Sequence, residues 1–272
     1  MPNQLTTRII SALVAVTVLF CTVYFFHLKG VLWMSFFVSV VGSYEMSKLI
    51  FSNQYPKFSK TLFVAISMIA LSYFQYYTRI EFVYLLFPLT FTLVGALSII
   101  FHKQFSKIED IFSYVAKFVL GLMYAVFLPL MIMWILQAAD GMIWFLCLLA
   151  VVFSGDIGAY TFGTLFGKTK IAPLLSPKKS LQGSIGGLLF STVAAGLFSL
   201  LLPTVPLGIL LMLGFFGGLL GQIGDFFESL IKRIAGVKDS GSIMPGHGGV
   251  LDRLDGVYFA SPLFFIVLYY II

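Results

Sequence analysis

Long runs of apolar residues recur from one end of the chain to the other and are separated by shorter polar stretches. A helix that spans the hydrocarbon core of a bilayer needs about 20 mainly apolar residues. Runs of about that length occur nine times, with boundaries loose by several residues: 9–26, 31–50, 61–77, 82–101, 112–137, 142–164, 184–202, 206–226 and 256–272. Strands are not expected, because backbone groups in lipid must be hydrogen-bonded within helices or within a closed barrel. The pattern predicts an all-α polytopic membrane protein with about nine transmembrane helices.

Composition agrees with a membrane protein. Of the 272 residues, 60% are hydrophobic and only 10% are charged, whereas soluble domains carry about 25% charged residues. Both cysteines, Cys21 and Cys147, fall inside apolar runs, which excludes a disulfide framework or a metal-ligand spacing. The first run ends in bulky residues where a signal peptide would need small ones, so we expect a retained helix.

The distribution of positive charge predicts the topology. The net charge of +6 is better explained by basic loops kept on the cytoplasmic side than by nucleic-acid binding. With a cytoplasmic N-terminus, fourteen of the 17 Lys and Arg residues fall in cytoplasmic segments. The same orientation places the two long polar loops, about 165–183 and 227–255, in the cytoplasm.

Ionisable residues gather between Ser229 and Asp255, in a chain that is otherwise apolar. The segment holds four cations, three carboxylates and one histidine: Lys232, Arg233, Lys238, Arg253, Asp239, Asp252, Asp255 and His247. Membrane proteins keep such groups where they handle charge, because placing each one in lipid costs about 2.5–3.5 kcal/mol. A mixture of carboxylates and cations suits a phosphate and a divalent metal ion together.

Carboxylates near this segment predict a metal site. Asp225 ends a glycine-rich apolar run, and Asp252 and Asp255 are three residues apart, so they share one face if that segment is helical. Asp156 lies within an apolar run, and an intramembrane carboxylate is a candidate functional residue. Oxygen-rich pockets suit Mg²⁺, usually with waters and substrate phosphates. Alternatively, these acids form ion pairs with neighbouring cations.

Two further features favour phosphate binding. Residues 245–249 read Pro-Gly-His-Gly-Gly, and glycines let backbone N–H groups approach an anion closely, although a simple turn explains them equally. Lys178, Lys179 and Ser180 precede a helix expected to start near Gln182, and a helix N-terminus with basic and hydroxyl groups attracts phosphate. The lysines alternatively set topology only. Glycine pairs four residues apart (163/167, 183/187 and 217/221) indicate close helix packing.

The Ser229–Asp255 segment resembles the signature of the phosphatidate cytidylyltransferases, also called CDP-diacylglycerol synthases. The shared pattern is Ser, Lys-Arg, Lys-Asp, Pro-Gly-His-Gly-Gly and Asp-Arg-x-Asp. The Asp-x-Gly-Ala-Tyr motif from Asp156 and the Ser-Pro-Lys-Lys-Ser-x-Gln-Gly motif at 176–183 also resemble family motifs. The resemblance is strong from about residue 150 onward. Ser180 stands where the family often has Thr, and Gln182 stands where it often has Glu, which removes a charge.

The resemblance implies that CTP and phosphatidic acid react to give CDP-diacylglycerol and diphosphate, with Mg²⁺ as cofactor. It implies one integral membrane domain, with N-terminal transmembrane helices in 1–140 and a catalytic half in 141–272. Implied metal ligands are Asp225 and Asp252, then Asp255 and Asp156; a second divalent or a monovalent cation is left open. Groups implied to bind the substrates or act in catalysis are Lys178, Lys179, Ser180, Lys232, Arg233, Lys238, Asp239, His247 and Arg253. His247 is expected to contact phosphate rather than act as a base.

Two other functions remain open at this stage. One is a related cytidylyltransferase that acts on another lipid phosphate; the other is an ion-coupled transporter, which the position of the polar residues near one face disfavours. For the enzyme, we expect a multi-pass protein of the inner (cell) membrane with its active site facing the cytoplasm. The expected partners are CTP, phosphatidic acid and the bilayer, with no nucleic acid, and the glycine-rich helices allow a homodimer.

Overall fold

The computed structural model describes residues 4–51, 55–77, 80–246 and 248–272, and most of these are helical, with no β-strand among them. Five helical stretches in this part of the chain are long and apolar enough to cross a membrane: Thr17–Ile50, Ile108–Gln137, Gly141–Phe166, Leu181–Leu200 and Leu207–Ile234. The all-α membrane architecture is therefore confirmed. The count of nine spans and their orientation stay predictions.

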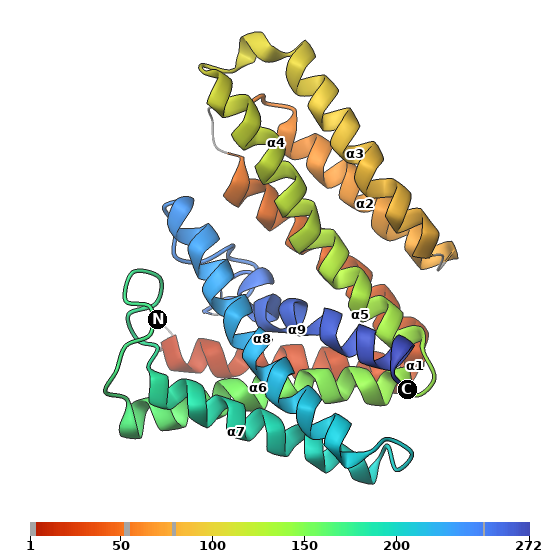
Figure 1. Cartoon of the computed structure of the whole chain (residues 1–272), viewed down its shortest axis with the longest axis vertical. Coiled ribbons are helices and arrows are strands. Elements are labelled where there is room, and N and C mark those ends of the chain that lie inside the picture. Colours follow the sequence, from red (N-terminus) through yellow and green to blue (C-terminus); the bar gives the residue numbers. More distant parts are fainter. Residues whose placement is uncertain (1–3, 52–54, 78–79, 247) are drawn as a thin grey trace. The chain divides into compact units, whose positions relative to one another are not determined.

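The chain divides into two compact units, and the first comprises Met1–Leu130 together with Ala235–Leu251 (Figure 1). Its helices are α1 (Gln4–Ile50), α2 (Ser59–Tyr77), α3 (Ile80–Ile100) and α4 (Ile108–Leu122), with a 3₁₀ turn at His102–Gln104. Helix α1 is broken at His27, where φ is 51°, so it contains the two expected apolar helices. Its second part packs against α2 and α4. The centre of this packing is an aromatic cluster that includes Phe51, Phe63, Tyr114 and Phe118.

Helix α4 continues through a π turn, Met123–Phe127, into α5 (Leu128–Gln137). Pro129 interrupts the regular pattern here, because a proline has no N–H to donate to the carbonyl four residues earlier, that of Ala125. The Ser43 hydroxyl from α1 donates to this carbonyl at 3.2 Å. A side chain from another helix thus supplies a donor that the proline removes.

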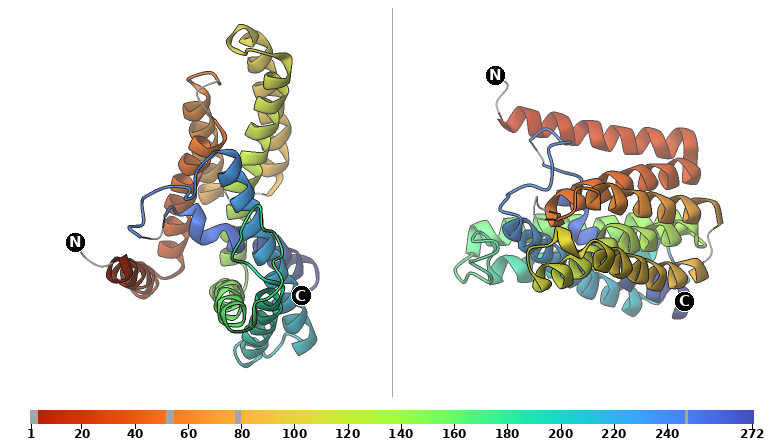
Figure 2. Two further views of the ribbon diagram at one scale, coloured as in Figure 1. Left: turned by 90° about the vertical axis from the view of Figure 1, so that its left-hand side faces the viewer. Right: turned by 90° about the horizontal axis from the view of Figure 1, so that it is seen from above.

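The second unit comprises Met131–Ile234 and Asp252–Ile272. It contains α6 (Gly141–Phe166), α7 (Leu181–Leu197), α8 (Leu207–Ile234) and α9 (Leu251–Tyr270), with a 3₁₀ turn at Phe198–Leu200. Helices α6 and α7 run side by side in all views (Figures 1 and 2). These four helices carry most of the residues that the sequence singled out.

Glycines let α6 and α7 approach until their backbones touch. A Cβ atom at Gly183 would lie 2.7 Å from the Ala159 carbonyl oxygen, and one at Gly187 would lie 2.9 Å from that of Gly155. No side chain fits at such distances. The packing role expected of the 183/187 glycine pair is confirmed.

The second polar loop is shorter than its composition indicates. Helix α8 runs to Ile234 rather than ending near 226, and α9 begins at Leu251 rather than near 256. Glu228 and Lys232, one turn apart on α8, form an ion pair, which stabilises a helix that continues past its apolar run. The acids at 225, 252 and 255 therefore all project from helices.

Candidate active site

A cavity of about 300 Å³ lies within the second unit, where α6, α7 and α8 meet the loop 167–180. Its polar lining comes from four segments that are far apart in the sequence: Asp156, Tyr160, Thr164, Lys178, Lys179, Ser180, Ser184, Gln222 and Asp225. Asp156 from α6 and Asp225 from α8 thus share one cavity with the two lysines of the loop. The cavity has both the positive charge that attracts phosphate and the carboxylates that attract a divalent cation.

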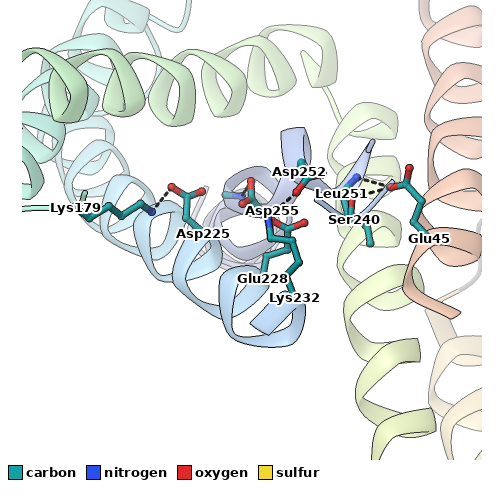
Figure 3. Close-up of polar contacts among 10 residues, drawn as sticks. Glu45, Lys179, Asp225, Glu228, Lys232, Ser240, Leu251, Asp252 and Asp255 are labelled. Atoms are coloured by element: carbon teal, nitrogen blue, oxygen red, sulfur yellow. Dashed lines mark hydrogen bonds and ion pairs between the residues drawn. The ribbon is translucent and has the colours of Figure 1, made fainter. Parts of the chain in front are cut away.

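The first ion pair of the site joins the loop to α8. Lys179 Nζ lies 2.6 Å from Asp225 Oδ2 (Figure 3) and 4.4 Å from the centre of the Phe226 ring. Both side chains of the ion pair are partly buried. A residue expected to bind phosphate and one expected to bind metal are therefore direct neighbours, although 46 positions separate them.

A second set of ion pairs, centred on Lys232, joins α8 to α9. Lys232 Nζ lies 2.7 Å from Glu228 Oε2 and 2.5 Å from Asp252 Oδ1 (Figure 3). The side chains of Glu228 and Asp252 are only 1% and 6% exposed. Two buried carboxylates therefore share one ammonium group.

Asp255 lies near a carboxylate from each of these two sets of ion pairs. Its carboxyl group lies close enough to Asp225 and Glu228 for their charges to act on it (Figure 3). Gly224 makes this possible, because a Cβ atom there would lie 2.5 Å from the Asp255 carbonyl oxygen. The helices thus bring Asp225, Glu228, Asp252 and Asp255 into a row of carboxylates (Figure 3).

The donor set suits a hard cation that completes its shell with substrate. Among the described residues, no group of three or more His, Cys, Asp or Glu side chains is set to hold a metal ion. Mg²⁺ however commonly takes one or two protein carboxylates, with waters and substrate phosphates in its other positions. The row supplies oxygen donors only, and Glu228 Oε1 is buried without a hydrogen-bond partner. The ligand roles of Asp225, Asp252, Asp255 and Asp156 stay predictions.

Two residues of the 176–183 motif organise the cavity wall. Ser180 is the N-cap of α7, and its Oγ accepts a hydrogen bond from the Gly183 N–H at 3.2 Å. Gln182 Oε1 accepts from the backbone N–H groups of Lys168 at 3.0 Å and Thr169 at 3.2 Å. Gln182 thus fixes the start of the loop 167–180 to α7, a role that needs an oxygen acceptor and no charge.

The remaining candidates do not line the cavity, although Arg253 is close enough to Asp156 for its charge to act on that carboxyl group. Arg233, in the last turn of α8, and Arg253, in the first turn of α9, are exposed and do not line the cavity. Lys238 and Asp239 are exposed and belong to the first unit. His247 lies outside the described residues, so its expected contact with phosphate stays a prediction.

Comparison with known proteins places this chain in a family. The model of the cytidylyltransferase family matches residues 6–271. The chain belongs to the cytidylyltransferase family. This confirms the resemblance seen in the Ser229–Asp255 signature.

Curated members of the family with similar sequences are called phosphatidate cytidylyltransferases. One from Staphylococcus saprophyticus is 42% identical over 131 residues, which is 48% of this chain and 50% of the relative. One from Bacillus subtilis is 44% identical over 120 residues, 43% of this chain and 44% of the relative. The chain thus spans about half the length of the curated relatives it matches.

Two features of this family member were not expected. Gln222 and Ser184 join α8 to α7 at the cavity: the Ser184 hydroxyl donates to Gln222 Oε1, and Gln222 Nε2 donates to the Ser184 carbonyl at 3.1 Å. The second is Glu45, a buried carboxylate of α1. The rule that drew attention to Asp156, an acid within an apolar run, applies equally to Glu45 and would have found it.

Proposed function

We propose that this chain is a phosphatidate cytidylyltransferase, which forms CDP-diacylglycerol and diphosphate from CTP and phosphatidate. The observation that carries the proposal is the cavity in which Lys178 and Lys179 meet Asp156 and Asp225, beside the row of carboxylates on α8 and α9. Its support from outside the structure is the family match over 6–271 and the names of the curated relatives.

The reaction joins two anions, so charge neutralisation and positioning are its main requirements. An oxygen of the phosphatidate phosphate forms a bond to the α-phosphorus of CTP. The bond from that phosphorus to the oxygen bridging to the β-phosphate breaks, and diphosphate leaves with the electron pair. A phosphate monoester has its second pKa near 6, so the attacking group is already an anion and needs no strong base.

The residues of the site divide this work by charge. We assign the binding of phosphate oxygens to Lys178 and Lys179, which line the cavity. When bound, Mg²⁺ would neutralise charge on the nucleotide phosphates and the departing diphosphate. Asp225 and Asp252 are the carboxylates that we propose to hold it, with Asp255 and Asp156 beside them. Lys232 keeps Asp252 in place through their 2.5 Å contact.

The substrates also constrain the location. CTP is soluble in water, whereas the acyl chains of phosphatidate stay in the bilayer, so the reaction needs a site at a membrane surface. We place it at the cytoplasmic face of the inner membrane, where the lysine-rich loop 167–180 is expected by the positive-inside rule. A homodimer remains an expectation from the sequence.

The test is incorporation of label from CTP into lipid. Purified protein in detergent is incubated with radiolabelled CTP, Mg²⁺ and phosphatidate; parallel reactions contain EDTA, no lipid acceptor, or a polyprenyl phosphate. We expect labelled liponucleotide with phosphatidate only, its loss with EDTA, and its loss in Asp252→Asn. Label on the polyprenyl phosphate alone would instead establish the related transferase, and no label from folded protein with either acceptor would refute both activities.

A further inference from the structure

Glu45 is a carboxylate of α1 that the proposed chemistry does not use. It is 2% exposed, and its two carboxylate oxygens accept three hydrogen bonds, all within the first unit (Figure 3). The donors are the Ser240 hydroxyl at 3.2 Å, the Val250 N–H at 3.1 Å and the Leu251 N–H at 3.0 Å. All three donors lie about two hundred positions later in the chain.

Two of these donors belong to the start of α9. Leu251 is the first residue of this helix and Val250 precedes it. The first N–H groups of a helix have no acceptor within the helix, and an N-cap residue such as Ser or Asp usually supplies one. Val250 has no side-chain acceptor. Glu45, which belongs to α1, supplies the missing acceptor instead. Its negative charge also interacts favourably with the dipole of α9.

Glycines of the 235–250 loop make room for this carboxylate. A Cβ atom at Gly249 would lie 2.5 Å from both Glu45 Oε1 and Oε2, and one at Gly241 would collide with Oε1. Gly249 belongs to the Pro-Gly-His-Gly-Gly segment, in which glycines were considered for phosphate binding. At this position the structure offers a different reason for glycine, which is close approach to the protein's own anion.

We propose that Glu45 is a positioning residue for Asp252. By fixing the N–H groups of Val250 and Leu251 it sets where α9 begins, and the next residue along the chain is Asp252, whose carboxylate holds the Lys232 ammonium. The activity part of this inference rests on the proposed function. Among the described residues, the hydrogen-bond partners of Glu45 are Ser240, Val250 and Leu251, to which no part of the chemistry is assigned.

Amide hydrogen exchange and catalysis, measured on the same full-length protein in detergent, test the role. The variants are Glu45→Ala and Glu45→Gln, which keeps one oxygen acceptor without the charge. The matched control is Ser43→Ala, because Ser43 is also buried in α1 but donates to Ala125 and not to α9. Peptides that cover 248–255 report exchange at the helix start, and Mg²⁺ titrations report the metal requirement for turnover.

For Glu45→Ala we expect exchange at Val250 and Leu251 to accelerate roughly tenfold. Turnover should fall by about 10- to 100-fold, as for residues that orient metal ligands, with a raised Mg²⁺ requirement. Glu45→Gln should lie between Glu45→Ala and the wild type, and it carries the test if the alanine variant does not fold. Ser43→Ala should match the wild type in both exchange and Mg²⁺ requirement.

Two results would overturn the inference. Unchanged exchange at 250–251 in the Glu45 variants would show that Glu45 does not cap α9. Faster exchange with an unchanged Mg²⁺ dependence would reduce Glu45 to a stabilising role. If the wild type itself makes no liponucleotide, the proposed function fails. Mn²⁺ binding, followed by electron paramagnetic resonance, then decides the positioning role, and equal affinity in wild type and Glu45→Ala would refute it.

Discussion

The shared ammonium group of Lys232 provides the sharpest test of the site. Lys232→Met keeps an unbranched, mostly apolar side chain and removes the charge that two carboxylates share. Those carboxylates belong to side chains that are 1% and 6% exposed. Removing one partner of a buried ion pair costs about 3–5 kcal/mol, which is a large part of the roughly 5–15 kcal/mol that stabilises a typical domain.

The partner variant Asp252→Asn should destabilise the protein less than Lys232→Met does. It leaves Lys232 paired with Glu228 at 2.7 Å, and the asparagine oxygen can still accept a hydrogen bond. We expect a cost of about 1–2 kcal/mol. The double variant Lys232→Met/Asp252→Asn should be more stable than the sum of the two single changes implies, because it carries one fewer of the buried negative charges that the ammonium group contacts.

Thermal unfolding in detergent measures these differences. One kcal/mol corresponds to about 2–4 °C in a protein of 150–250 residues, so Lys232→Met should lower the midpoint by roughly 6–20 °C. Lys178→Met, at an exposed lysine of the cavity, is the control and should unfold like the wild type. Added Mg²⁺ should raise the midpoint of Lys232→Met more than that of the wild type, because the cation replaces the missing charge.

The reasoning would be refuted by either of two results. A Lys232→Met protein with the wild-type midpoint would show that the two carboxylates do not depend on the ammonium. Equal destabilisation by Lys232→Met and Asp252→Asn would show that Lys232 does not serve both acids.

Three further predictions concern residues that position the helices and the loop of the site. Gly158→Ala should lower the thermal midpoint, since its Cβ would lie 2.6 Å from the Gly186 carbonyl oxygen, whereas Gly208→Ala, with no atom within 4 Å, should leave it unchanged or raise it. Ser180→Ala should destabilise the protein by about 1 kcal/mol, the usual cost of a lost N-cap; a midpoint equal to that of the wild type would contradict the cap. Gln182→Glu should preserve the resistance of the loop 167–180 to limited proteolysis and Gln182→Ala should lose it; equal cleavage of the two would contradict the acceptor role.

The helices could be predicted well from the sequence because lipid-facing segments must be apolar over a fixed length. The run 142–164 corresponds to α6 at Gly141–Phe166, and 61–77 corresponds to α2 at Ser59–Tyr77. The end of α8 could not be placed, because Glu228 and Lys232 look like loop residues in a hydropathy pattern. Their pairing one turn apart, a contact that hydropathy does not register, favours the helical conformation.

The candidate site could be predicted in part, where spacing carries information. Asp252 and Asp255 were expected on one helical face, and the structure places both in the first turns of α9. The contact of Lys179 with Asp225 could not be predicted, because residues 46 positions apart meet only when α7 and α8 pack. Periodicity reports which face of a helix is polar but not which helix faces it.

The Ser229–Asp255 segment shows why a signature should be separated into its physical parts. Lys232, Asp252 and Asp255 take part in the network of charges on α8 and α9. Ser240 and Gly249 instead surround the carboxylate of Glu45, in a different unit of the chain. A residue of a sequence motif can therefore be required for the fold of the protein as well as for its chemistry. The two requirements make different predictions, since a change at Gly249 should act through the cap of α9, whereas a change at Asp252 should act directly on the charge of the site.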